Sequence, residues 1–319
     1  MKTFKNPIIY TIKVSLLTFT FFCLRTSVVY SQMQANKRQE SAVNEKLTPP
    51  RGHYKLLQGF SPAAKSLAEK TDSLSYISDP ASVKKRLSLM PFYLSDTSLS
   101  DFKIPSPPAN SSLQTQAELR YMFELEKNRT DEDIKESHFL SEIYYDLKIH
   151  KGDSLYDDNR ANLFYIGHSV GTWFTAKSLP LTADLMANVW QDANYFIWAF
   201  KYKYARIRPY ILESRLHNLE KADAPSYPTG TATDAYLLAY IYQKLAPEFT
   251  DVFIADAYKM AHSREIIGVH FPSDIEGSRI LARQIADKLF QNEKFRNDFE
   301  KVKAEWALKG KEKLTGISE

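Results

Sequence analysis

The sequence predicts an all-α fold in which a single bundle of roughly eight to ten helices forms the main domain. Apolar residues recur at three- and four-residue spacing along most of the chain beyond residue 112, as on helices with one buried face. No dipeptide of the Asn-Gly kind and no convincing alternating segment indicates a β-hairpin or strand. Only 10 of the 319 residues are glycine, whereas soluble proteins average roughly 7%. The low glycine content therefore argues against a glycine-punctuated all-β fold or a glycine-loop architecture.

The predicted helices follow a proline-rich segment, residues 104–112, that is expected to be extended. Asn110, Ser111 and Ser112 at its end offer N-cap side chains for the first helix. Pro209 ends the fourth helix because proline cannot continue one. The expected helices are residues 113–125, 132–149, 159–176, 181–204, 231–245, 249–264, 272–290 and 293–308.

The first 31 residues have the pattern of a secretory signal peptide. They contain four basic residues and no acidic one, and residues 14–24 are eleven uncharged, mainly apolar residues. Eleven residues rise only about 16 Å as a helix, too short for a hydrocarbon core of roughly 30 Å. Cleavage near Ser31 would give an exported, periplasmic bacterial protein. Two alternatives stay open. Arg25 behind the apolar run is atypical of a cleaved signal and leaves open an uncleaved anchor, and Cys23 could indicate a lipoprotein, although Phe22 before it is too large for the usual small-residue site.

The net charge of +4 and the single cysteine both belong to this first segment. Removal of the segment would leave a neutral chain without cysteine. A neutral chain lacks the basic footprint of a nucleic-acid-binding protein. A chain without cysteine has neither a disulfide framework nor a thiol nucleophile. No later stretch approaches about 18 uncharged apolar residues, so no integral membrane span is expected after the signal.

Residues 32–101 are polar and rich in serine and lysine, with weak helical patches such as residues 63–70. This composition predicts a partly ordered leader that wraps the main domain or spaces it from a membrane. The main all-α domain is expected over residues 102–310.

The first of three short motifs is Lys-Tyr-Lys-Tyr-Ala-Arg-Ile-Arg-Pro at residues 201–209. Lys201 and Arg208 are seven residues apart, two helical turns, so both cations are expected on one face. Arginine offers a planar fork to two phosphate oxygens, and lysine offers a compact point charge. Taken alone, the motif also fits an ordinary solvated basic surface.

The second motif, Ser-Tyr-Pro-Thr-Gly-Thr at residues 226–231, is a turn that leads into a predicted helix. Gly230 lets a ligand approach the backbone closely, and free N–H groups at a helix start favour an anion. Thr229 adds a hydroxyl donor. An ordinary helix N-cap is the alternative interpretation.

The third motif, residues 263–274, reads Ser-Arg-Glu-Ile-Ile-Gly-Val-His-Phe-Pro-Ser-Asp. Arg264 closes one helix, and Gly268 interrupts it. Asp274 lies four residues after His270, so its carboxylate can accept a hydrogen bond from one ring nitrogen and leave the other free to attack. A His-x-x-x-Asp pair alone is also compatible with a structural role.

Together the three motifs resemble the signature of the type 2 phosphatidic acid phosphatase and vanadium haloperoxidase superfamily. The likeness covers about residues 100–309 and is strongest to the soluble, exported branch, the bacterial class A non-specific acid phosphatases. It implies the all-α fold of that superfamily and metal-independent hydrolysis of phosphomonoesters through a phosphohistidine.

The resemblance also implies a role for each matching residue. His270 would be the nucleophile, and Asp274 its orienting partner. No cofactor is implied, although phosphate or vanadate could occupy the site, and the expected partners are small-molecule or lipid phosphomonoesters. The phosphate-binding residues would be Lys201, Arg208, Thr229, Gly230 and Arg264.

Thr231 departs from the family pattern, which has a histidine there to protonate the leaving oxygen. General acid catalysis contributes roughly 10²–10⁴-fold, and threonine cannot provide it near neutral pH. Three explanations compete. Another group such as Asp234, His217 or His262 donates the proton, or the substrates have acidic leaving groups, or the protein has changed toward phosphate binding with little turnover.

Other functions fit parts of the sequence. A vanadate-dependent haloperoxidase would bind vanadate with the same phosphate-binding residues, but its chemistry also uses the histidine that is missing here. A lipid phosphatase of the membrane branch would need internal spans, although an exported soluble form could still meet lipid phosphates. A non-enzymatic phosphate-binding or structural helical protein is the third alternative, and self-association is left open.

Overall fold

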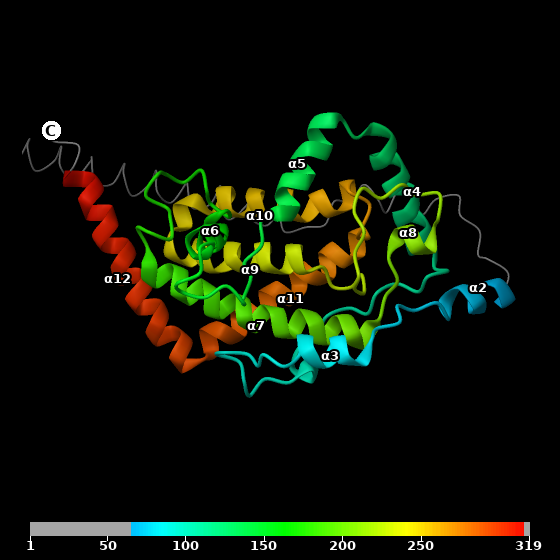
Figure 1. The fold of residues 1–319 in the computed structure, drawn as a ribbon, viewed down its shortest axis with the longest axis horizontal. Coiled ribbons are helices and arrows are strands. Elements are labelled where there is room, and N and C mark those ends of the chain that lie inside the picture. Colours follow the sequence, from blue (N-terminus) through cyan, green and yellow to red (C-terminus); the bar gives the residue numbers. More distant parts are fainter. Residues whose placement is uncertain (1–64, 316–319) are drawn as a thin grey trace, which may run out of the picture. The chain divides into compact units, whose positions relative to one another are not determined.

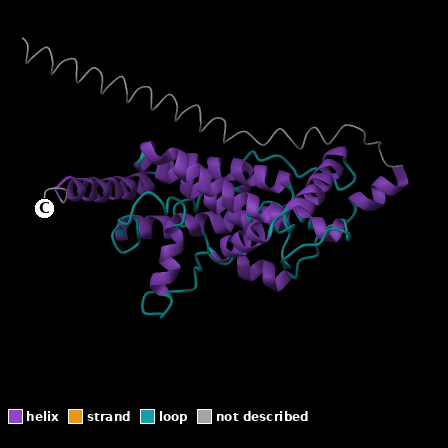
Figure 2. Ribbon diagram, turned by 90° about the horizontal axis from the view of Figure 1, so that it is seen from above, coloured by secondary structure: helices purple, strands orange, loops and turns teal. Residues whose placement is uncertain are grey.

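The computed structural model describes residues 65–315, and helices joined by turns and loops make up this part of the chain (Figure 2). No strand occurs within these residues, which confirms the predicted all-α fold class. The predicted signal peptide, residues 1–31, and residues 32–64 of the predicted leader lie outside the described residues. Between residues 65 and 315, none of the helices combines the length and the apolarity that crossing a membrane requires.

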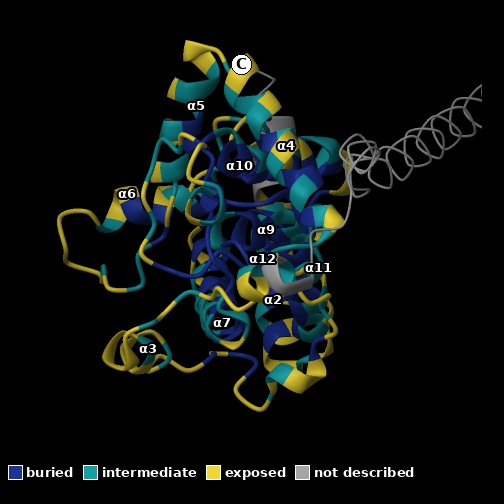
Figure 3. Cartoon of the chain, turned by 90° about the vertical axis from the view of Figure 1, so that its right-hand side faces the viewer, coloured by how far each residue is buried: buried dark blue, intermediate teal, exposed yellow. Residues whose placement is uncertain are grey.

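Helix α9, Gly230–Leu245, is the most deeply buried helix of the described fold (Figure 3). It packs against α7 (Pro180–Tyr204), α10 (Thr250–Ile266) and α11 (Pro272–Gln291) (Figure 1). Every residue from 232 to 242 is buried. A helix buried on all sides needs small or apolar residues around its whole circumference. Asp234 is the one charged residue in that run.

Further elements cover or precede this core. They are α2 (Lys65–Asp72), α3 (Pro80–Arg86), η2 (Leu99–Asp101), α4 (Leu113–Asn128), α5 (Asp131–Glu142), α6 (Tyr156–Ala161), η3 (Asn162–Phe164), α8 (Pro209–Leu212), η4 (Pro247–Phe249) and α12 (Glu293–Thr315). Helices α4 and α5 pack against α10, and α12 packs against α7 and α11. The hydroxyl of Ser112 accepts a hydrogen bond from the Thr115 backbone N–H at 3.2 Å and so caps α4.

Two predicted helices are wrong in extent. Helix α5 ends at Glu142, so it is shorter than the predicted helix 132–149. Beyond it, the Asn159 side chain exchanges hydrogen bonds of 2.7 and 3.0 Å with the backbone of Asp146 and holds the chain in an extended path. The predicted helix 159–176 consists of turns beyond η3. Gly167 there has a φ of +97°, a left-handed conformation that interrupts a helix.

Part of the predicted leader packs on the helical core, since α3 lies against α7. Tyr93 and Leu94 are buried, and their backbone N–H groups donate to the buried Asp192 carboxylate of α7 at 3.1 and 2.9 Å. Burial raises the pKa of Asp192 to about 6, although these hydrogen bonds oppose the rise. The leader therefore supplies core residues as well as the helix α3.

Candidate active site

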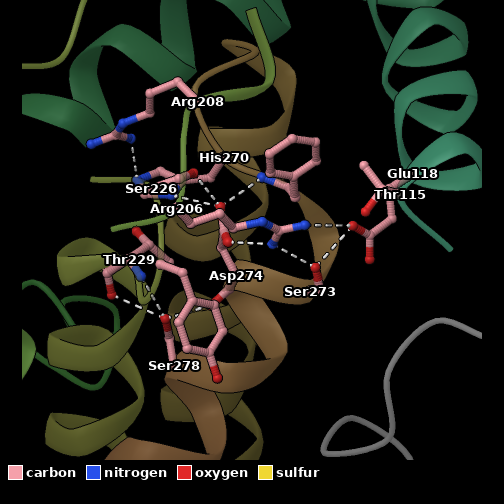
Figure 4. Close-up of polar contacts among 12 residues, drawn as sticks. Thr115, Glu118, Arg206, Arg208, Ser226, Thr229, His270, Ser273, Asp274 and Ser278 are labelled. Carbon is pink, nitrogen blue, oxygen red and sulfur yellow. Dashed lines mark hydrogen bonds and ion pairs between the residues drawn. The ribbon is translucent and has the colours of Figure 1, made fainter. Parts of the chain in front are cut away.

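The three motifs meet at the N-terminal end of α9, around a cavity of about 260 Å³. Asp274 is fully buried in the first turn of α11 and contacts His270 without lining the cavity (Figure 4). The other predicted site residues line the cavity itself: Lys201, Arg208, Thr229, Gly230, Thr231, Arg264 and His270.

The hydrogen bonds of His270 define its protonation. Its Nδ1 lies 3.2 Å from Asp274 Oδ2, and its Nε2 lies 2.8 Å from Arg208 Nη1. Because a carboxylate accepts and a guanidinium donates, Nδ1 carries the proton and Nε2 presents a lone pair. Burial and the positive charge of Arg208 lower the pKa of His270 well below its usual value. These contacts favour a neutral imidazole whose Nε2 lone pair accepts a hydrogen bond from Arg208.

The residues that hold Asp274 in place were given no role in the sequence analysis. Arg206 Nη1 donates to Asp274 Oδ1 at 2.6 Å, while the Ser226 hydroxyl and the Phe271 N–H donate to Oδ2 at 2.5 and 2.9 Å (Figure 4). Burial alone would raise the pKa of Asp274, but Arg206 and the hydrogen bonds from His270 and Ser226 hold it well below its usual range. Asp274 therefore stays a carboxylate and fixes the tautomer of His270.

Arg206 is itself fixed by buried groups. Its guanidinium carbon lies 4.0 Å from the ring centroid of Phe271, and its Nη2 lies 3.4 Å from Glu118 Oε2 of α4. Ser273 accepts a hydrogen bond from Arg206 and donates one to Glu118, each at 2.8 Å. The only sequence signal for this role is the Arg-x-Arg of the first motif, which offers a second cation beside Arg208.

Backbone carbonyl groups hold two of the cavity cations in place. Lys201 Nζ donates to Pro225 O at 2.7 Å, and Arg208 donates to Ala224 O and Val269 O at 2.8 and 2.9 Å. Burial lowers the pKa of Lys201, and the charge of Arg208 lowers it further. An anion in the cavity would favour the cationic form of Lys201.

Two other residues present buried donor atoms that have no hydrogen-bond partner within the described chain. Arg264 Nη2 pairs with Glu220 at 2.6 Å, but Arg264 Nε and Nη1 have no partner. The hydroxyl of Thr229 is buried and unpartnered in the same way. A buried unsatisfied polar group costs roughly 1–3 kcal/mol, so folded proteins keep few of them. Several around one cavity indicate a site for an anion that satisfies them.

Gly230 has no side chain to cover the backbone at the start of α9. A β-carbon there would contact only Ile197 Cγ2 at 3.9 Å, so packing within the protein does not require glycine. The first N–H groups of a helix have no intrahelical partner, and the helix dipole favours an anion beside them. Because Gly230 lines the cavity, its N–H is a candidate donor to an anion there.

One more polar residue of α9 lines the same cavity as Thr231. Asp234 lies three residues after Thr231, about one helical turn, and is buried with its Oδ1 unpartnered. Burial raises the pKa of Asp234 well above its usual value. Burial therefore favours the neutral, protonated form of this carboxyl group, one turn beyond Thr231.

The two histidines considered as alternative acids do not line this cavity. Nδ1 of His217 lies 2.7 Å from Glu126 Oε1, and its side chain is 80% exposed. Nδ1 of His262 lies 2.6 Å from Glu265 Oε2. Burial would lower the pKa of His262, but this pairing outweighs it and raises the pKa. Of the three surrogates named from the sequence, only Asp234 is placed at the cavity.

Contact between Tyr227 and α11 fixes the turn that carries Thr229. A β-carbon on Gly277 would overlap the Tyr227 ring and hydroxyl, and that hydroxyl donates to Pro105 O at 2.5 Å. We expect Gly277→Ala to lower the free energy of unfolding by about 1–3 kcal/mol, because overpacking displaces neighbours. Urea unfolding measures this change.

A matched control for Gly277→Ala is Asp287→Ala, an exposed position of the same helix. It should change the free energy of unfolding by less than about 0.5 kcal/mol. Equal stability of the two variants would contradict the steric role of Gly277.

Comparison with known proteins finds relatives among non-specific acid phosphatases. The chain is 29% identical over 153 residues to the one from Providencia stuartii, covering 46% of this chain and 61% of that protein. It is 25% identical over 225 residues to the one from Salmonella typhi, covering 68% and 84%. The structure of the first bacterial vanadium-dependent iodoperoxidase aligns with a TM-score of 0.50 and 16% identity, covering 70% of this chain and 64% of that one. No family model matches the chain.

The fold and the sequence relatives support the type 2 phosphatidic acid phosphatase and vanadium haloperoxidase superfamily for this chain. Within it, the chain stands near the class A non-specific acid phosphatases. The resemblance predicted from the three motifs is thereby confirmed. At 16% identity the likeness to the iodoperoxidase shows the fold alone. The match to the Providencia protein spans less than two thirds of that protein.

Proposed function

We propose that the protein is a phosphatase that hydrolyses phosphomonoesters through a phosphohistidine at His270. One observation carries this proposal: a neutral imidazole, whose Nε2 lone pair accepts a hydrogen bond from Arg208, lines the same cavity as four cationic side chains and several unpartnered donors. Nucleophile and anion-binding groups in one buried site are the parts that phosphoryl transfer requires. The non-specific acid phosphatases among the relatives support the same reaction class.

The cavity cations would bind the phosphoryl group. Their positive charge can neutralise the phosphate and stabilise the equatorial oxygens of the transition state without a metal ion. Inorganic phosphate and vanadate are both tetrahedral oxyanions, so both should compete with substrate. The proposed ligands are Lys201, Arg208, Arg264, the Thr229 hydroxyl and the Gly230 N–H.

The first chemical step would begin at His270 Nε2, whose lone pair forms the N–P bond. The bond between phosphorus and the ester oxygen breaks, and its electron pair leaves with that oxygen. Arg208 Nη1, which donates to Nε2 at 2.8 Å, would transfer its hydrogen bond to a phosphate oxygen. Asp274 would retain the Nδ1 proton in a hydrogen bond and stabilise the positive charge on the ring.

We assign the proton donor for the leaving oxygen to Asp234, directly or through one water molecule. Three facts support this choice: the carboxyl group lines the cavity, its Oδ1 is buried and free, and it lies one turn beyond Thr231. In the second step a water molecule would attack phosphorus and pass a proton to the ionised Asp234. The N–P bond then breaks, which releases phosphate and restores neutral His270.

Rapid-quench labelling tests the phosphohistidine. With a ³²P-labelled aryl phosphate, the enzyme should yield an acid-labile, base-stable label on the peptide that contains His270. Normal turnover with label on another residue, or a rate of label formation slower than turnover, would contradict the proposed intermediate.

The threonine at position 231 favours a second candidate, a phosphate-binding protein with little turnover. Calorimetric binding of phosphate without hydrolysis of any aryl or alkyl ester would support it. A vanadate-dependent haloperoxidase is tested by iodide oxidation with vanadate and peroxide, in which the phosphatase proposal expects no activity.

We also propose export of the protein to the periplasm, where it would act on small-molecule or exported lipid phosphomonoesters. The predicted signal peptide, residues 1–31, supports this location. Mass spectrometry of the periplasmic protein should show an N-terminus near residue 32. Full-length protein confined to the cytoplasm would contradict export.

A further inference from the structure

A second cavity, about 560 Å³ in volume, adjoins the phosphate cavity. The two cavities share four lining residues, Arg86, Tyr144, Asn194 and Trp198. Helix α3, which belongs to the predicted leader, forms part of its wall. A substrate whose phosphoryl group occupies the first cavity therefore has adjoining space for the rest of the molecule.

Cations predominate among the charged residues of the second cavity. Lys85 and Arg86 from the end of α3 and Lys148 from the segment after α5 line it, against one carboxylate, Asp146. All three cations are exposed. None of the salt bridges within residues 65–315 includes them. Their charges are therefore available to a ligand.

Arg86 links the two cavities. Its guanidinium carbon lies 4.1 Å from the ring centroid of Trp198 on α7, a cation–π contact that holds the group in place. A guanidinium stacked by its face keeps its N–H edge free for an anion. The pKa of Lys201 is lowered mainly by burial and by the charge of Arg208, and Arg86 contributes a smaller lowering. Arg86 is therefore close enough to act electrostatically on the first cavity.

We propose that the second cavity binds the leaving group of the substrate, and that this leaving group carries a second anion held by Arg86 with Lys85 and Lys148. The inference rests on the proposed phosphatase function and narrows its substrate class. That class is phosphomonoesters of small leaving groups with a phosphate or carboxylate at the far end. The volume of the cavity lies in the range of small-molecule sites, and its cations would remain unpaired with a neutral leaving group.

A comparison of three phosphate esters tests this substrate class. We compare kcat/KM for glucose 6-phosphate, which has no second anion, with glucose 1,6-bisphosphate and 6-phosphogluconate, which carry a phosphate and a carboxylate. Each substrate with a second anion is expected to exceed glucose 6-phosphate in kcat/KM by about tenfold, because charge-assisted hydrogen bonds to that anion contribute to binding. Each value of kcat/KM is divided by that for glucose 6-phosphate, and the larger of the two ratios shows whether the site prefers a phosphate or a carboxylate as the second anion. Because the cations are exposed, the ratios should fall as salt increases.

Variants of the cavity test the residues involved. Arg86→Gln, and separately the double variant Lys85→Gln with Lys148→Gln, should bring kcat/KM for each substrate with a second anion to within about twofold of kcat/KM for glucose 6-phosphate. The matched control is Lys84→Gln, which makes the same change on the same helix at an exposed residue that lines neither cavity. It should keep the wild-type ratio and the wild-type activity on glucose 6-phosphate.

The outcomes separate this inference from the phosphatase function. Turnover of all three esters with equal kcat/KM, or ratios unchanged in both cavity variants, would overturn the second anion site. Absence of turnover for every ester would overturn the phosphatase function instead. In that case calorimetry with glucose 1,6-bisphosphate and glucose 6-phosphate still decides, because equal affinities would also overturn the site.

Discussion

Replacement of His270 by alanine should lower kcat for any phosphomonoester by about 10⁴-fold or more, because the proposed nucleophile is removed. No other imidazole within the described chain lines the cavity, so no nearby ring nitrogen can take its place. The ³²P label of the rapid-quench experiment should vanish in the same variant. Steady-state rates with nitrophenyl phosphate and quench labelling measure the two effects.

A matched control for His270→Ala is His217→Ala. That histidine is exposed, pairs with Glu126, and does not line the cavity. Its replacement should leave kcat within about twofold of wild type, since surface substitutions rarely disturb a site. Turnover that persists in His270→Ala at more than about 1% of the wild-type rate would remove this residue as nucleophile.

Asp234→Asn should separate substrates by the acidity of their leaving group. For an alkyl phosphate we expect kcat to fall by roughly 10²–10⁴-fold, because an alkoxide leaves poorly without a proton. For nitrophenyl phosphate, whose leaving group is already acidic, the loss should stay below about tenfold. The measurement is kcat for both esters in wild type and variant, together with urea unfolding to exclude loss of structure.

The pH profiles follow from two opposite pKa shifts. The lowered pKa of His270 keeps its Nε2 unprotonated in acid, so activity is lost only as pH falls through that lowered value. The raised pKa of Asp234 keeps the acid protonated, so turnover of alkyl esters is lost as pH rises through that raised value. The active window for alkyl esters lies between the two. The alkaline loss should be absent for nitrophenyl phosphate, and absent for both esters in Asp234→Asn.

Two further variants sharpen this assignment. Asp223→Asn makes the same chemical change at an exposed carboxylate that lines the same cavity, and it should leave the ratio of alkyl to aryl turnover unchanged. Thr231→His in the Asp234→Asn background should restore alkyl turnover, since it returns the family acid to its position. An equal loss for both esters in Asp234→Asn would show that Asp234 acts through structure instead.

The long helices and the motif residues that line the cavity were largely predictable because both depend on local patterns. Apolar spacing identifies α7, α9, α10 and α11 to within a few residues, and the motifs name the cavity cations. The errors arose where a non-local contact replaces periodicity, as where Asn159 binds the backbone of Asp146 and ends α5 early. The predicted helix 159–176 was lost to turns around Gly167, whose φ of +97° no apolar pattern reveals.

The sequence by itself determined the fold class, the family resemblance, and the position at which the expected general acid is missing. Only the tertiary structure decided which groups surround that position. It directs Arg206 to Asp274, leaves Asp234 Oδ1 buried and unpartnered at the cavity, and places Arg86 of the leader at the same cavity as Lys201. The physical reason is that burial, pKa and hydrogen-bond pairing depend on residues far apart in the chain, which local spacing cannot encode.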